Sequence, residues 1–355
     1  DVLYAQFGSG YQRLVSLGRQ AGSGCDASVS QQDYDTAGNL AWREDFNGHK
    51  ACYSNDLSRN LEAVRVEGLA KGAACTVTGA GATLPAGARK TSTQWHPDWH
   101  LATKTAEPGR ITTRVYNGQP DPFAGGALAS CAPTDALLPD GKPIVVLCKE
   151  VEQATTDTNG AQGFAAALSS TPARVQSWTY NRWGQVLSHD GPRTDVADIT
   201  TYEYYPSSDT DWTMGDLKQV TNPAGQITRF PKYNKAGKVL QMVDANGIAT
   251  DYSYDLRQRV KSVSTGGATT SYDYYPTGLL KQVTEPDASW VGYEYDAAHR
   301  LVAVKDSLGN RIDYTLDNAG NRTAEQIKDP SGALKRRAQR SFDALGRVEQ
   351  LTGRE

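Results

Sequence analysis

The stretch Tyr233-Asn234-Lys235-Ala236-Gly237-Lys238-Val239 decides the fold. It consists of an aromatic residue, Asp or Asn, two variable positions, Gly, a polar residue and an aliphatic residue. The same pattern, with some departures, begins again at Tyr34, Tyr180, Tyr254, Tyr274, Tyr295, Leu316 and Phe342. From Tyr233 onward the starts lie 21, 20, 21, 21 and 26 residues apart. A nearly fixed period predicts a repeat architecture in which each unit packs against its neighbours.

Each unit also contains Asp/Asn-x-x-Gly corners, one in the main pattern and one between copies. The first side chain is expected to accept hydrogen bonds from the amides two and three residues on, and Gly at the fourth position supplies a positive φ. This predicts a type I turn followed by a bulge, with strands of about six or seven residues between corners. The predicted structural repeat positions are Tyr34, Asp35, Gly38, Tyr180, Gly184, Tyr233, Gly237, Tyr254, Asp255, Tyr274, Gly278, Tyr295, Asp296, Asp317, Gly320, Phe342, Asp343 and Gly346.

The segments between corners alternate in the way that strands do. Before one corner, Thr250, Tyr252 and Tyr254 are interleaved with the polar residues Asp251 and Ser253. A period of two places the first set on one face of a sheet and the second set on the other. Strands joined by four-residue turns run antiparallel to one another. The sequence therefore predicts an all-β fold, a long meandering sheet to which each hairpin adds beside the last.

Composition excludes several classes of function. The chain has 355 residues, of which 38% are hydrophobic, with 34 Gly and 16 Pro, as suits a β-protein with many turns. A net charge of −3 argues against a nucleic-acid-binding face. The absence of an apolar run of about 18 residues predicts that no helix spans a membrane. The chain opens on Asp1 rather than Met, and we expect it to be a piece of a longer protein.

The cysteines leave two interpretations open. No two of them stand in a Cys-x-x-Cys spacing, which argues against a zinc ribbon or a thioredoxin-type site. Cys131 and Cys148 bracket a loop and could staple it in an oxidising compartment, but scattered buried thiols fit equally well. The five positions are Cys25, Cys52, Cys75, Cys131 and Cys148.

Reaction motifs are lacking, and we expect no catalytic residue, no cofactor and no metal. His96, Asp98 and His100 would share one face of a strand and could hold a metal, but Pro97 and the place of this segment in the repeat favour a structural strand with a bulge. A glycosidase-like use of carboxylates is the least favoured alternative, since turn chemistry already explains their spacing. The pairs considered are Asp190 with Asp195 and Glu203 with Asp209.

The repeat resembles the YD-repeat, or Rhs, family, whose unit is Tyr-Asp-x-x-Gly-Arg-Leu. The resemblance is strong over 180–348 and weaker over 34–117. We therefore expect three segments: degenerate repeats in 1–118, a Pro/Ala/Gly-rich insertion loop in 119–172 with a short strand at Ile144–Leu147, and regular repeats in 173–355 that are truncated at the C-terminal end. Asp329-Pro330-Ser331-Gly332 matches the self-cleavage string of the family's toxins, but its place in the array favours a turn.

The resemblance implies a sheet that coils into a curved or hollow β-shell, similar to the shells of insecticidal toxin complex C-components and teneurins. It predicts a non-catalytic shell segment that encapsulates a C-terminal toxin or effector domain for delivery in interbacterial competition. The expected partners are the remainder of the parent polypeptide and this cargo, with surface glycans or a secretion-machinery protein as further candidates, and the expected location is secreted or at the cell surface. The alternative is a cell-surface adhesin that binds carbohydrate or a receptor, for which the 18 Tyr and 7 Trp are suited.

Overall fold

The computed structural model describes residues 2–6, 12–19, 28–79, 81–343 and 346–354, so Cys25 lies outside the described residues. Within these ranges the regular structure is β-strand apart from two short 3-10 helices, η1 (Cys75–Thr78) and η2 (Gly163–Ala165). Strand pairs are antiparallel and join neighbours in the chain. The predicted all-β antiparallel fold is confirmed. No helix in the described part of the chain is long and apolar enough to cross a membrane.

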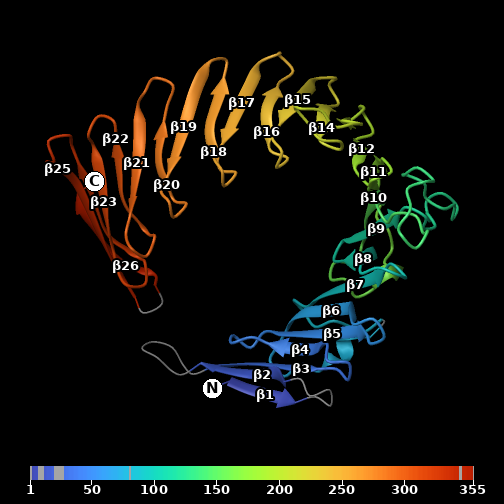
Figure 1. Cartoon of the computed structure of the whole chain (residues 1–355). Helices are drawn as coiled ribbons and strands as arrows, with labels where there is room; N and C mark the ends of the chain where they lie inside the picture. The colour runs from blue at the N-terminus through green and yellow to red at the C-terminus, as the bar shows by residue number, and fades with distance from the viewer. Residues whose placement is uncertain (1, 7–11, 20–27, 80, 344–345, 355) are drawn as a thin grey trace. The chain divides into compact units, whose positions relative to one another are not determined.

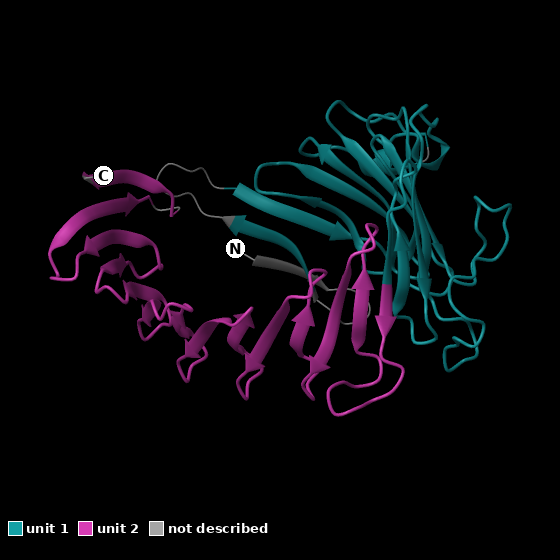
Figure 2. Ribbon diagram, turned by 90° about the horizontal axis from the view of Figure 1, so that it is seen from above, with its two compact units in different colours: residues 1–201 teal, residues 202–355 magenta. Residues whose placement is uncertain are grey.

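The chain divides into two compact units, residues 1–201 and 202–355 (Figure 2). The strands of the first unit are β1 (Val2–Gln6), β2 (Gln12–Arg19), β3 (Ser28–Tyr34), β4 (Leu40–Glu44), β5 (Lys50–Asp56), β6 (Leu61–Leu69), β7 (Arg89–Trp95), β8 (Ala102–Glu107), β9 (Arg110–Tyr116), β10 (Leu147–Ala154), β11 (Arg174–Tyr180) and β12 (Val186–Asp190). The boundary falls inside β13 (Ile199–Tyr204).

The strands of the second unit follow one another in chain order along a curved row (Figure 1). They are β14 (Leu217–Thr221), β15 (Ile227–Tyr233), β16 (Val239–Val243), β17 (Ala249–Tyr254), β18 (Val260–Thr265), β19 (Ala268–Tyr274), β20 (Leu280–Thr284), β21 (Trp290–Tyr295), β22 (Leu301–Asp306), β23 (Arg311–Leu316), β24 (Arg322–Lys328), β25 (Leu334–Phe342) and β26 (Val348–Arg354).

The first unit has a hydrophobic core because its long connections fold back onto the sheet. Leu84 and Ala88, from the connection between β6 and β7, pack against Cys52, Val66 and Leu69 of β5 and β6. A disulfide between Cys52 and Cys75 ties the same connection to the sheet. A second cluster joins Ala106 and Ile111 to Ala166, which lies just after η2.

The second unit is different, because its sheet is a single layer. Among its described residues, the hydrophobic side chains that are buried are Tyr233, Ala303 and Ala324. The other apolar side chains of its strands are partly or largely exposed. Short hairpin turns join most of its strands, and the 205–216 connection between β13 and β14 is longer. Stability in this unit therefore rests on cross-strand pairs and on the corners, rather than on a packed interior.

The connection from 117 to 146 departs from the expected pattern. The strand predicted at Ile144–Leu147 was misplaced: β10 begins at Leu147 and pairs with β9 and β11. Ion pairs to β9 stabilise the polar half of β10: Arg114 with Glu150 at 2.8 Å and Arg110 with Glu152 at 3.3 Å. The sequence of one strand alone does not show these pairs. The segment boundaries after 118 and 172 describe how regular the repeat is, and they stay predictions.

Candidate functional site

The aromatic residues of the repeat occupy one structural position. Each is the last residue of its strand and stands next to a shift in pairing register, as Tyr254 does opposite Val260. The strands β3, β11, β15, β17, β19, β21 and β25 end in this way at Tyr34, Tyr180, Tyr233, Tyr254, Tyr274, Tyr295 and Phe342.

The corner that follows is closed by its first side chain, as Asp255 shows. Oδ1 of Asp255 accepts the backbone N–H groups of Arg257 at 2.8 Å and of Arg259 at 3.0 Å. The expected bond to the amide three residues on was wrong, because the carbonyl of Asp255 takes the N–H of Gln258 at 2.9 Å. The carboxylate binds the amides two and four residues on instead. The same two bonds form at Asp35, Asn181, Asn234, Asp244, Asp296, Asp306 and Asp329.

The fourth corner position requires a positive φ, which glycine adopts without steric cost. Gly237 has φ 74° and Gly320 has φ 90°. The other predicted glycines share this conformation: Gly38, Gly184, Gly278 and Gly346. Three non-glycine residues take the same place in related corners, Gln258 at φ 61°, Ala288 at φ 70° and His299 at φ 64°.

The residue that follows the glycine position also belongs to the corner. Sequence reasoning described this residue only as polar. In Asp255 the second carboxylate oxygen accepts Nε of Arg259 at 2.7 Å, and this pair lowers the pKa of Asp255. Arginine makes the same contact with Asp296 and Asp343, and asparagine makes it with Asp317. Arg259 also lies over the ring of Tyr274, 4.2 Å from its centroid, so that one corner contacts the next repeat.

Five of the tyrosines that end these strands each bind the strand that precedes them. The hydroxyl of Tyr254 donates to the carbonyl of Val239 at 2.9 Å, and Val239 is the residue that pairs with Tyr233. Burial raises the pKa of Tyr180, of Tyr254 and of Tyr233, the last to about 12. The other bonds of this phenol–carbonyl tie are Tyr34 to Leu14 at 2.8 Å, Tyr180 to Leu147 at 2.8 Å, Tyr233 to Leu217 at 2.6 Å and Tyr274 to Val260 at 2.9 Å.

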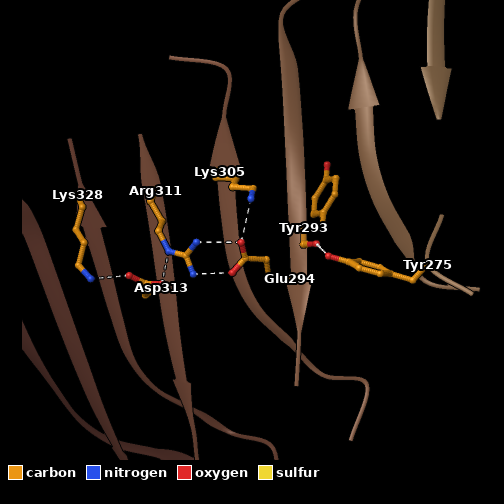
Figure 3. Close-up of polar contacts among 7 residues, drawn as sticks. All are labelled: Tyr275, Tyr293, Glu294, Lys305, Arg311, Asp313 and Lys328. Atoms are coloured by element: carbon orange, nitrogen blue, oxygen red, sulfur yellow. Dashed lines mark hydrogen bonds and ion pairs between the residues drawn. The ribbon is translucent and has the colours of Figure 1, made fainter. Parts of the chain in front are cut away.

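Tyr275 replaces the carboxylate at its corner and points the other way. Its backbone still closes the turn, since its N–H donates to Leu279 and its carbonyl accepts from Gly278. Its hydroxyl donates forward to the carbonyl of Tyr293 at 3.1 Å (Figure 3), and its ring meets that of Tyr295 edge to face. The corner is thus held by a neighbouring strand rather than by its own side chain.

The sheet of the second unit has two chemically different faces. On one face, cross-strand pairing places Tyr293 beside Val304, Val304 beside Ile312 and Ile312 beside Ile327. These side chains are only partly buried. Because the side chains of a strand alternate between faces, the residues between them form a polar face on the opposite side.

A line of alternating charges crosses this polar face (Figure 3). Glu294 binds Lys305 at 3.1 Å and Arg311 at 2.7 Å; Asp313 in turn binds Arg311 and Lys328, both at 2.7 Å. Arg311 lowers the pKa of Glu294, while Glu294 and Asp313 raise the pKa of Arg311. A Cβ on the glycine at 292 would come within 3.3 Å of Lys305 Cε, so glycine leaves room for that side chain.

The histidine segment does not form the predicted strand. β7 ends at Trp95 and β8 begins at Ala102, so His96, Asp98 and His100 lie in a loop, where Pro97 and the bends around it prevent ladder pairing. His96 is 1% exposed; its Nδ1 accepts the N–H of Asp98 at 3.1 Å, and burial lowers its pKa. The described residues contain no group of three His, Cys, Asp or Glu side chains placed to bind a metal.

The carboxylates considered as an acid–base pair are engaged in local contacts. Asp195 pairs with Arg193 at 2.7 Å, and Glu203 pairs with Lys218 at 3.5 Å. Asp329 forms the same corner as the other repeats, as predicted, with its carbonyl accepting from Gly332 at 2.9 Å.

The family model of the teneurin YD-shell matches residues 213–335. Over this region the chain is similar to the YD/Rhs-repeat shell family. Double-stranded DNA deaminase toxin A of Burkholderia cenocepacia is 37% identical over 121 residues, which are 34% of this chain and 8% of the relative. The tRNA3(Ser)-specific nuclease WapA of Bacillus spizizenii is 26% identical over 132 residues, 36% of this chain and 6% of the relative. These matches span less than a tenth of each relative's length.

Solved structures share the fold of this chain. The crystal structure of TcdB2-TccC3-TEV matches with a TM-score of 0.59 and 14% identity, over 95% of this chain and 16% of the solved chain. The crystal structure of TcdB2-TccC3 without its hypervariable C-terminal region matches with a TM-score of 0.53 and 15% identity, over 97% of this chain and 20% of the other. The likeness therefore extends over both units.

Two features of this chain were missed or left open by sequence reasoning. The Cys131–Cys148 disulfide forms, which confirms the staple over the alternative of separate thiols. The Cys52–Cys75 disulfide was missed, because these residues are 23 positions apart and only the fold of the 70–88 connection brings them together. In the loop-entropy account each cross-link removes about 3 kcal/mol of unfolded-state freedom.

Proposed function

We propose that this chain is a non-catalytic wall segment of a β-shell that encloses a C-terminal toxin or effector domain of its parent polypeptide. The carrying observation is the single-layered second unit, whose sheet has one apolar and one charged face and no packed interior of its own. A globular enzyme buries the apolar face of its sheet under a second layer. A shell wall leaves the apolar face of its sheet available to the polypeptide that the shell surrounds.

The toxin relatives and the shell structures support the same proposal at the level of the family. The partners we propose are the remainder of the parent chain and its cargo, with delivery in interbacterial competition. The two disulfides support an exported location, since such bonds persist in oxidising compartments. We also propose that the tyrosine, Asp/Asn and glycine positions of the repeat serve the wall and not a reaction, because their polar atoms are spent on backbone groups.

The test removes two whole repeats from the full-length parent. Deleting residues 255–295 joins Tyr254 to Asp296 and preserves the order of an aromatic residue followed by a corner. The expected result is that the downstream domain becomes sensitive to protease and active without any release step. Leu256→Ala is the control, since this side chain is fully exposed at a corner tip and its loss leaves the wall intact. Unchanged protease resistance and unchanged cargo activity in the deletion variant would contradict the proposal.

A further inference from the structure

The first unit contains an open cavity of about 630 Å³ on one face of its sheet. The floor is made by β7 to β10, and one wall is the 119–126 part of the connection between β9 and β10, which projects beside these strands (Figure 1). The opposite wall is formed by Trp95 and Pro97, where β7 ends.

The floor presents polar side chains in a row, and most of their hydrogen-bonding capacity is unused. Gln94 pairs with Lys104, and Lys104 pairs with Thr113, so the three side chains lie on one face of neighbouring strands. Gln153 of β10 also lines the cavity. In the described part of the chain, Lys104 forms no ion pair and the side-chain amides of Gln94 and Gln153 have no hydrogen-bond partner. Lys104 contacts the ring of Phe164 at 5.4 Å.

The aromatic walls are held in place before any ligand arrives. Nε1 of Trp95 donates to the carbonyl of Glu62 at 2.9 Å, which fixes the indole while its ring borders the cavity. On the other side, Asp121 anchors its loop by an ion pair with Lys149 and by accepting the N–H of Phe123 at 2.8 Å. The Phe123 ring remains 44% exposed at the cavity edge. A prebuilt site lowers the entropic cost of binding.

The chemistry of the lining selects a class of ligand. The residues around the cavity include Lys104 and Arg114 and no Asp or Glu, so the ligand is not cationic. Arg114 is already paired with Glu150, which leaves Lys104 as the available charge. The floor strands are interior strands whose backbone groups are taken by neighbours on both sides, so an extended peptide could not add to the sheet here.

We propose that this cavity binds an acidic oligosaccharide, with a pyranose ring held between Trp95 and Phe123 and a sugar carboxylate bound by Lys104. Side-chain amides donate and accept at once, which matches neighbouring sugar hydroxyls at Gln94 and Gln153. Aromatic rings offer large, rigid contact area to the apolar face of a sugar. The site lies in the first unit and involves no cargo, so it stands or falls separately from the wall function.

The experiment titrates the full chain with a galacturonic acid hexamer, with cellohexaose as the neutral comparator, and follows the heat of binding. We expect saturable binding of the acidic hexamer and weaker binding of cellohexaose. Lys104→Gln should weaken binding of the acidic hexamer by about tenfold and leave cellohexaose unaffected, because a charge-assisted bond is lost. Phe123→Ala should weaken binding of both on the order of fivefold.

The matched controls are Lys71→Gln, a surface lysine of the same unit, and Leu128→Ala, an exposed residue of the same connection outside the cavity lining. Both should bind like the parent chain, and thermal midpoints within about 2 °C of the parent show that each variant folds. The proposal is overturned if neither saccharide binds, if cellohexaose binds as well as the acidic hexamer, or if the cavity variants bind as the controls do. Binding of a polyproline peptide, lost in Phe123→Ala while saccharides fail to bind, overturns it in favour of a peptide site.

Discussion

Tyr233 gives a direct test of the phenol–carbonyl tie. Its side chain is 8% exposed, its hydroxyl donates to the Leu217 carbonyl at 2.6 Å, and burial raises its pKa from 10.0 to about 12. The folded chain therefore holds the phenol proton more tightly than the unfolded chain does. This contribution to stability is fully present below pH 10, and it is lost as the pH rises through 12.

The magnitude follows from the shift. Two pKa units correspond to about 3 kcal/mol in total, of which about 2 kcal/mol is lost by pH 11.5. Tyr233→Phe removes the titrating group together with its hydrogen bond. At neutral pH this variant should lose about 1–3 kcal/mol of unfolding free energy, because the Leu217 carbonyl is left without its phenol partner.

The assay is urea unfolding at pH 9 and at pH 11.5, followed by tryptophan fluorescence, for the parent chain, Tyr233→Phe and Tyr272→Phe. The hydroxyl of Tyr272 makes no hydrogen bond in the described part of the chain, which makes it a matched control. Between the two pH values the parent and the control should lose about 2 kcal/mol more than Tyr233→Phe does. If all three proteins lose the same free energy, the buried phenol does not couple to folding and the reasoning is refuted.

Three further outcomes are expected. Ala288→Gly should stabilise the second unit by about 1 kcal/mol and Gly237→Ala should destabilise it by about 1–2 kcal/mol, since both positions have positive φ; urea midpoints that move in the opposite order would contradict this. Replacing Cys131 and Cys148 with Ser should speed proteolysis within 119–143, and equal cleavage rates would exclude a stapling role. Burial opposes ionisation of Asp121, yet hydrogen bonds from Lys149 and Phe123 lower its pKa below 3.8. The stability that this carboxylate contributes above pH 4 should therefore be lost on acidification. In hydrogen exchange of the 119–129 backbone, Asp121→Asn should reduce this pH-dependent loss of protection.

The local half of the fold could be predicted from the sequence because the corners are local. Asp255, Arg257 and Arg259 lie within five positions of one another, and a repeated short pattern shows where each turn begins. The contact of Tyr254 with Val239 joins adjacent strands, so the sequence indicated the tyrosine but not the carbonyl that it binds.

The rest depends on contacts between distant segments. The Cys52–Cys75 bond and the true position of β10 follow from connections that fold back over the first unit. The cavity was not predicted, because Phe123 reaches it from an insertion that carries no repeat, and Lys104 and Gln94 are ordinary strand residues. Polar side chains without a hydrogen-bond partner can be recognised only once the structure shows which neighbouring groups could have bonded to them.

The direction of the phenol–carbonyl tie bears on the order in which such a wall can assemble. Tyr34, Tyr180, Tyr233, Tyr254 and Tyr274 all reach back to a strand made earlier in the chain, and none of these five bonds waits for a later one. A polypeptide emerging with its N-terminus first, whether from a ribosome or a narrow export channel, would find the acceptor for each of these rings already laid down. The sheet can then grow one hairpin at a time, and each finished hairpin acts as the template for the next.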